Sequence, residues 1–399
     1  MPHVPGVTGS GVTGLALHPD HTWSLATELE VDDEREAVWL SSLGLVATVR
    51  QVVNDQWRLR VRVVNDTATA QPITGLRLEL DADDPVTRTL VRRWGGGARA
   101  FLMADDGESC VLARQVTGFA LDDDLPGLRL FPGTTLEPGA ATTCEWALEP
   151  LGSPRDVLAH LPAWWPDRLV RRGDDPVVLG DGTELLPTGD RLTIPEERGE
   201  TVLAVVSLPG MDEAVAHALA HPACAGAAEV VLRQAAPGTD DLAARVEELL
   251  SRGAPDPLAV IAAARELAAT GSSDLVDVVT DALDRLRGDD LAVGVARMHA
   301  ALALTAAGAP VPELGPVRLP STTDLALLGG GLPGRGSAAP LDVARTIAAC
   351  ALLPPAVGPW PPERWPVPFD EVILQATAEV LACDPDPEVV AWLVLGNAW

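Results

Sequence analysis

The sequence predicts a multidomain protein of the β-then-α class, in which an N-terminal antiparallel β-sandwich is followed by an α-helical domain of α/α hairpins. Two periodicities predict this order: apolar and polar residues alternate in the first half, and apolar residues recur every three or four positions in the second. The length of 399 residues, with 47% hydrophobic content, supplies material for more than one core. We divide the chain into a flexible N-terminus at 1–20, a β-sandwich domain at 21–208 and a helical domain at 209–399.

The predicted sandwich consists of short alternating segments separated by turn sequences rich in Asn, Asp and Gly. Many short strands at this spacing are typical of an antiparallel sandwich rather than a parallel sheet. A helical connector is expected at about 154–170, where prolines end a short amphipathic run. Strands are expected at residues 22–31, 37–43, 45–53, 57–65, 73–81 and 109–116, and again, after the connector, at 176–180, 191–195 and 201–209.

Beyond Pro209 the spacing becomes that of amphipathic helices. Capping residues support several of them: Ser273-Asp274 precedes one helix, Gly253 and Gly271 follow two others, and Gly308 closes a long one. A Gly/Pro-rich stretch at about 309–340 is expected to be a loop. Helices are expected at residues 212–221, 241–252, 257–270, 273–286, 291–308, 341–353, 370–382 and 387–396.

The segment 201–252 has two interpretations. Strand-like and helix-like runs alternate in it, which fits a small α/β insert. It also fits the last sandwich strands followed by the first helical hairpin, and we favour this second interpretation.

Composition excludes several functions. The net charge of −28 arises from 57 acidic and 29 basic residues, and such a field repels phosphate backbones and anionic membrane surfaces. We therefore expect neither a nucleic acid nor a membrane as partner. The chain contains no lysine and no tyrosine. Walker A phosphate loops, Schiff-base enzymes and protein kinases all need a lysine, so these classes are excluded.

Location is predicted from the absence of targeting features. The start, MPHVPGVTGSGVTG, lacks the basic and apolar regions of a secretory signal, and no apolar run reaches the roughly 20 residues of a membrane-spanning helix. We expect a cytoplasmic protein. Its five scattered cysteines then indicate buried free thiols rather than disulfides.

Two stretches carry a family resemblance. Residues 59–93 (LRVRVVNDTATAQPITGLRLELDADDPVTRTLVRR) resemble the N-terminal sandwich of glycogen-debranching and amylo-1,6-glucosidase-like proteins. Residues 257–286 are similar to the helices of their toroid-like (α/α) barrels, with Thr270-Gly271-Ser272 in place of a TGD-like turn and the acid displaced to Asp274. The resemblance implies a glycan-related protein. A full barrel of twelve helices needs roughly twice the helical length present, so the relation implies a truncated form.

Two further motifs are spaced like a metal site and a nucleotide site. Glu213, His217, His221 and Cys224 are spaced to share one helical face, but Pro222 disfavours helical geometry at His221. We therefore expect no metal site and no cofactor. The GxGxxG motif at residues 9–14 lacks the preceding strand and following helix that dinucleotide binding requires.

Tryptophan is the unusual feature, with 11 Trp against 4 Phe and no Tyr. Trp164, Trp165, Trp360 and Trp365 stand beside prolines in expected loops, where an exposed indole can stack on a sugar ring. These four are the predicted ligand-binding residues. The alternative is that tryptophan fills the cores in place of the missing aromatic residues.

Two functions remain. We favour a non-catalytic binding or scaffold protein, with a glycan or a protein as partner, and we assign no catalytic residue. The alternative is a glycoside hydrolase that acts on an α-glucan through a pair of carboxylates, since acidic residues are abundant.

Overall fold

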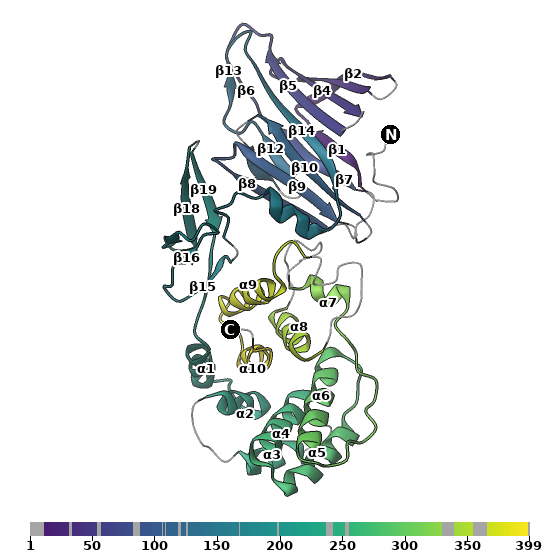
Figure 1. Ribbon diagram of the computed structural model, residues 1–399, viewed down its shortest axis with the longest axis vertical. Coiled ribbons are helices and arrows are strands. Elements are labelled where there is room, and N and C mark those ends of the chain that lie inside the picture. Colours follow the sequence, from purple (N-terminus) through teal and green to yellow (C-terminus); the bar gives the residue numbers. More distant parts are fainter. Residues whose placement is uncertain are drawn as a thin grey trace.

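A computed structural model shows two β-sheets stacked as a sandwich, followed by a region of packed helices (Figure 1). The predicted fold class is therefore confirmed. The structure describes residues 12–31, 34–53, 57–82, 88–105, 107, 109–118, 121–124, 127–166, 168–197, 199–236, 242–251, 255–328, 339–353 and 365–397.

The larger sheet has eight antiparallel strands. Strand β5 (Trp57–Asn65) shows why the sequence forms it: Trp57, Leu59, Val61 and Val63 are buried, and the arginines between them are exposed. Alternation of this kind is what a sheet with one solvated face requires. The strand order is β2 (Trp23–Val31), β3 (Glu34–Ser41), β4 (Leu45–Val53), β5, β14 (Ala141–Leu151), β10 (Cys110–Thr117), β9 (Arg99–Asp105) and β8 (Arg88–Trp94).

The smaller sheet has four strands in the order β1 (Val12–Pro19), β7 (Leu76–Ala82), β12 (Gly127–Leu130) and β11 (Leu121–Asp124). Leu15, Leu78 and Leu128 from this sheet share one hydrophobic core with the inner face of the larger sheet. The structure differs from the sequence prediction at residues 12–19, which were placed in a flexible terminus. They form β1 because Leu15 enters the core and the strand pairs along β7. A two-stranded pair, β6 (Gln71–Pro72) with β13 (Thr135–Leu136), lies beside the sandwich.

The 3₁₀ helix η1 (Pro154–His160) covers the outer face of the larger sheet at β8 to β10. It begins with a capping box, in which the Ser153 side chain and the N3 carboxylate of Asp156 satisfy each other's backbone N–H groups. Val157 of the helix packs into a small core with Phe101 and Leu112 of the sheet. This patch of the larger sheet is therefore buried on both faces.

The strands between residues 170 and 208 form short two-stranded pairs outside both sandwich sheets, whereas the sequence analysis placed them in the sandwich. The hairpin of β18 and β19 contacts the end of β8, where the Gly95 N–H donates to Glu196 Oε1 at 2.8 Å and to Thr201 Oγ1 at 2.9 Å. The pairs are β15 (Val170–Arg172) with β20 (Val206–Leu208), β16 (Val177–Val178) with β17 (Glu184–Leu185), and β18 (Arg191–Glu196) with β19 (Gly199–Ala204).

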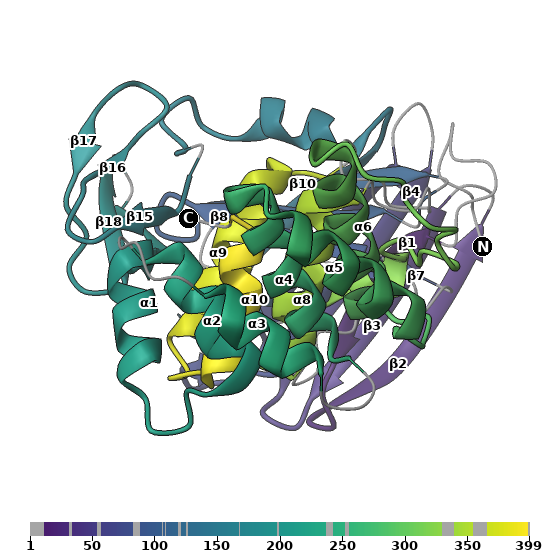
Figure 2. The same ribbon diagram turned by 90° about the horizontal axis from the view of Figure 1, so that it is seen from below.

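The helical region packs around one large hydrophobic core. Helix α4 starts at an Asp256 cap and ends at Gly271, whose φ of 64° is a left-handed conformation that glycine adopts without strain. Figure 2 shows these helices from below, with the strands of the sandwich behind them. The helices are α1 (Met211–Ala220), α2 (Gly226–Ala235), α3 (Ala243–Leu250), α4 (Pro257–Thr270), α5 (Ser273–Arg285), α6 (Leu291–Ala306), α7 (Thr322–Ala326), α8 (Pro340–Leu352), α9 (Phe369–Leu381) and α10 (Pro387–Leu395).

Two local assignments needed correction. Residues 228–234, one of the strand-like runs of the segment 201–252, belong to helix α2. Three consecutive apolar residues, Val230 to Leu232, look like a buried strand in the sequence, but all three are buried on a helix. The expected loop at about 309–340 contains the short helix α7.

Among the described residues, no helix combines the length and apolar character needed to cross a bilayer. All five cysteines are free. Cys110 and Cys144 are buried, as expected for inert thiols, whereas Cys383 is exposed. Burial raises the pKa of the Cys144 thiol to about 12.

Candidate functional site

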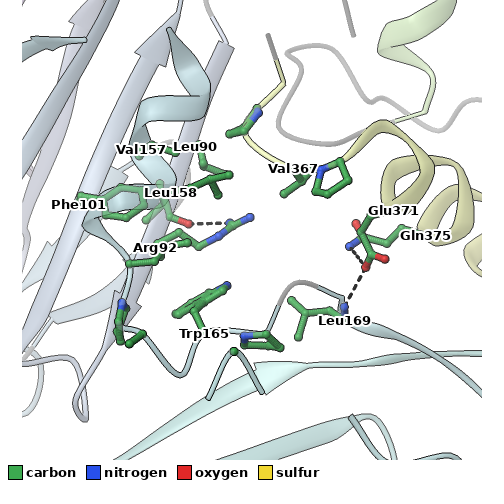
Figure 3. Close-up of a pocket in the computed structure, with 18 of the residues that line it drawn as sticks. Leu90, Arg92, Phe101, Val157, Leu158, Trp165, Leu169, Val367, Glu371 and Gln375 are labelled. Atoms are coloured by element: carbon green, nitrogen blue, oxygen red, sulfur yellow. Dashed lines mark hydrogen bonds between the residues drawn. The ribbon is translucent and has the colours of Figure 1, made fainter. Parts of the chain in front are cut away.

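A cavity of about 740 Å³ lies where the sandwich meets the helical region. Its walls come from β8, η1, the segment 161–169 and helix α9 with the residues just before it. Figure 3 shows these walls around the cavity, with Arg92 and Trp165 on one side and Glu371 and Gln375 on the other. Most of the lining is apolar, and the polar side chains in it are few. Junctions between domains are a common place for ligand pockets of this composition.

Trp165 supplies the large aromatic surface of the cavity. Its ring stacks on Trp164, with centroids 5.5 Å apart and planes inclined by 22°. The backbone of this segment is held by Gly180, whose N–H donates to Trp164 O at 3.1 Å. A Cβ atom at Gly180 would lie 2.5 Å from Ala163 O, so only glycine permits this close approach. The position of the tryptophan pair therefore depends on a glycine 15 residues further along the chain.

Arg92 brings a positive charge to the cavity from strand β8. One of its terminal nitrogens donates to Val91 O at 2.9 Å, and Figure 3 shows the guanidinium group reaching into the space above Trp165. A guanidinium carries five N–H donors in a fixed plane. Arg92 thus places guanidinium donors in the wall of the cavity.

Glu371 connects the two walls. Its Oε1 accepts a hydrogen bond from the Leu169 N–H at 2.8 Å and another from Gln375 Nε2 at 3.0 Å. The residue is 1% exposed, and within the described part of the chain its other oxygen, Oε2, is buried without a hydrogen-bond partner. Glu371 therefore fixes the Gln375 amide in the wall and ties helix α9 to the segment that carries Trp165.

A second link runs beside the first. Asp370 and Arg168, the residues that directly precede Glu371 and Leu169, form an ion pair at 2.9 Å. Both side chains are more than half exposed, so solvent screens this pair. Two consecutive acids in the first turn of α9 thus bind two consecutive residues of the connector, and the buried contact is the stronger of the two.

The structure places the four predicted tryptophans differently. Trp165 lines the cavity, and Trp164 stacks against it. Trp365 is 0% exposed and packs edge-on against Phe369, so its indole faces are covered by the helical core, as in the alternative that tryptophan fills the cores. Trp360 lies outside the described residues.

Sequence reasoning missed Arg92, Glu371 and Gln375. Glu371 and Gln375 are four residues apart on a helix and thus share a face, which is a weak signal. The hydrogen bond between Glu371 and Leu169 spans 202 residues, and no local pattern encodes such a contact.

The residues weighed as metal ligands do not share a helical face. Helix α1 ends at Ala220, and His221 is extended, as the following proline predicted. His217 is exposed and lies 3.0 Å from Asp384. A search of the described part of the chain finds no group of three or more His, Cys, Asp or Glu side chains able to hold a metal. Residues 12–14 of the glycine motif begin strand β1, and residues 9–11 lie outside the described part.

The titratable side chains in the described lining of the cavity are Arg92 and Glu371. Among its described lining residues, Glu371 is the single carboxylic acid, and one of its oxygens is occupied by two N–H donors. No His, Cys or Ser side chain belongs to this described lining. Glycoside hydrolysis needs two carboxyl groups facing one bond.

Comparison with known proteins assigns this chain to no family. No protein-family model matches the sequence, and no curated protein matches it. A solved structure described as a polysaccharide lyase superposes with a TM-score of 0.38 and 9% sequence identity, over 73% of this chain and 58% of that one. The chain thus spans little more than half the length of that structure. A likeness this distant says nothing about what this chain binds, and the resemblance to glycogen-debranching proteins gains no family match.

Proposed function

We propose that this protein is a non-catalytic binding protein and that its ligand is a short saccharide held in the junction cavity. The observation that carries the proposal is the combination in one cavity of the Trp165 ring with polar groups of Arg92 and Gln375 from opposite walls. A sugar ring has an apolar face of C–H groups and a rim of hydroxyls. The aromatic surface suits the first, and the donors and acceptors suit the second.

The size of the cavity supports a small ligand. Its volume of about 740 Å³ is within the range of roughly 300 to 1,000 Å³ that small-molecule sites occupy. The flanking walls are apolar, with Leu90, Phe101 and Val157 on the sandwich side. Such walls exclude water, so a hydrogen bond from the ligand to Gln375 is made in a medium of low dielectric, where it is stronger.

The described lining supports the part of the proposal that excludes turnover. A retaining or inverting glycosidase needs an acid and a second carboxylate roughly 5 to 9.5 Å apart. In the described lining, Glu371 has no carboxylate partner of this kind and is held by Leu169 and Gln375. We therefore place the hydrolase alternative second.

The test is a thermal-shift and calorimetric screen with short neutral oligosaccharides, since a ligand that binds only the folded state raises the melting temperature. Trp165→Leu keeps an apolar side chain at this position but removes the flat aromatic ring. Gln375→Leu keeps the volume but removes the amide. Each is expected to weaken binding about tenfold, the equivalent of one lost hydrogen bond or stacking contact. Gln71→Leu, at a half-buried glutamine of strand β6, is the matched control and should bind as the wild type does.

Product analysis runs in parallel. The proposal expects no new reducing ends after prolonged incubation with an α-glucan. Turnover that disappears in a single Asp or Glu variant would contradict it, and so would saccharide affinity that is equal in the wild type and in both cavity variants.

A further inference from the structure

A second hollow, separate from the junction cavity, lies at one end of the four-stranded sheet. Its volume is about 560 Å³, and it is lined by the end of β1, the turn that enters β7, and the turn that leaves β12. His18, Arg77 and Arg129 are its basic residues. They come from three different strands and converge on one space.

The strand register brings these three side chains together. His18 of β1 is paired with Arg77 of β7, and Arg77 is paired with Arg129 of β12. Directly opposed residues on neighbouring antiparallel strands point to the same face, with Cβ atoms about 5 Å apart. The neighbours Leu78 and Leu128 are fully buried in the sandwich core, so the basic row lies on the outer face.

Two acidic side chains, Glu79 and Asp20, lie near the row, and each already has a partner. Glu79, two residues along β7, forms an ion pair with Arg77. Asp20 lines the hollow, but its carboxylate accepts hydrogen bonds from the backbone and hydroxyl of Thr22, and these bonds lower its pKa. Asp20 therefore stays ionised at the edge of the hollow, with its carboxylate held by the turn.

Arg129, at the far end of the row, has its positive charge neutralised least by neighbouring acids. Asp122 stands opposite Arg129 on β11 but lies 3.3 Å from Arg93. Within the part of the chain that the structure describes, Arg129 has no carboxylate at ion-pair distance, and its side chain is exposed.

A basic row is costly in isolation, because like charges directly opposite each other on neighbouring strands destabilise a sheet. The chain as a whole carries −28, yet at physiological salt a charge is screened beyond about 8 Å. A bound anion therefore responds to the arginines of the hollow and much less to the distant acids. An anion between Arg77 and Arg129 would reduce their repulsion and accept hydrogen bonds from Arg129 and from the Arg77 donors that Glu79 leaves open.

We infer that this hollow binds a small tetrahedral oxyanion, a phosphate or sulfate group, between Arg77 and Arg129 with His18 at its edge. The hollow is larger than a free ion requires, so the group can come from inorganic phosphate or from a phosphorylated sugar. The inference concerns a different sheet from the junction cavity and does not depend on the saccharide proposal.

The experiment is a calorimetric titration of the full chain with inorganic phosphate and, separately, with glucose 6-phosphate. The wild type is expected to show saturable binding to at least one of them that weakens as salt rises. Arg129→Gln and Arg77→Gln are each expected to lower the affinity at least about tenfold, because each removes a charge-assisted contact. Arg62→Gln, at an exposed arginine of β5 on the other sheet, is the control and should leave the affinity unchanged.

The two ligands identify the source of the anion. Tighter binding of glucose 6-phosphate assigns the site to a sugar phosphate, and equal binding assigns it to the free ion. Saturable binding that is the same in Arg129→Gln, Arg77→Gln and the control would overturn the inference. The absence of saturable binding of either compound to a folded wild-type protein would overturn it as well.

Discussion

Replacement of Glu371 by alanine tests the contact that holds the two walls of the junction cavity together. The change removes the acceptor of two hydrogen bonds, from Leu169 N–H and from Gln375 Nε2. The half-buried Leu169 N–H, left without a partner, costs about 1 to 3 kcal/mol. Loss of the hydrogen bond from the Gln375 amide costs about 0.5 kcal/mol more. The unpartnered oxygen Oε2 is also removed, which returns about 1 kcal/mol. The net expectation is a loss of about 1.5 kcal/mol.

The neighbouring residue provides a matched control. Asp370→Ala removes a side chain from the same helical turn and breaks the ion pair with Arg168, but that pair is exposed and contributes less than about 1 kcal/mol. Glu371→Gln keeps an acceptor for Leu169 N–H and replaces Oε2 by a neutral amide nitrogen. It should therefore be much less harmful than Glu371→Ala.

Two assays measure the effect. Urea unfolding gives the free energy of unfolding, and hydrogen–deuterium exchange of the peptide around Leu169 reports the contact locally, since a two-part chain need not unfold in one step. Faster exchange at Leu169 in Glu371→Ala alone is the expected result. Equal exchange in the Glu371→Ala and Asp370→Ala variants would refute the reasoning.

Three further predictions concern the cores and the thiols. Burial, and then the charge of Arg265, lower the pKa of His299 from 6.5 to about 4. The unfolded chain therefore binds the His299 proton at a higher pH than the folded chain, and the free energy of unfolding falls by up to about 3 kcal/mol as pH drops from about 6.5 to 4. His299→Gln should flatten that part of a stability-against-pH curve, and an unchanged curve would contradict this. Trp365→Ala should cost about 3 to 5 kcal/mol in chemical unfolding because the ring is fully buried, and a loss below about 1 kcal/mol would show that it is not. Iodoacetamide at pH 8 should modify Cys383 in the native protein and spare Cys144 until it unfolds, as mass spectrometry of the peptides would show; rapid native labelling of Cys144 would be inconsistent with its burial.

Sequence periodicity predicted the elements whose burial pattern is regular. Strand β5 alternates without a break, and helix α5 carries Leu275, Val279 and Ala282 on one buried face. The prediction from periodicity failed where the apolar pattern fits more than one element. The run Val230 to Leu232 is apolar at every position and fits either element, and β1 follows a glycine-rich start that indicates a loop. In both cases tertiary burial, which the local sequence does not encode, decides the conformation.

The candidate site could be predicted only in part, for a similar reason. Trp165 was singled out from its type and its proline neighbours, which are visible in the local sequence, and it lines the cavity. The same reasoning suggested an exposed ring for Trp365, but the helical core covers that ring. Glu371 and Arg92 acquire their roles from contacts between segments far apart in the chain. A buried acid that meets a backbone N–H 202 residues away has no signature in a single sequence.

The central claim is that the junction cavity binds a short saccharide without cleaving it. The most direct measurement is a crystal structure of the protein grown with a neutral oligosaccharide. We expect an intact sugar ring over the indole of Trp165, with a hydroxyl group in hydrogen-bond contact with Gln375. A saccharide bound at another face with the cavity empty, or a cleaved product within it, would contradict the account.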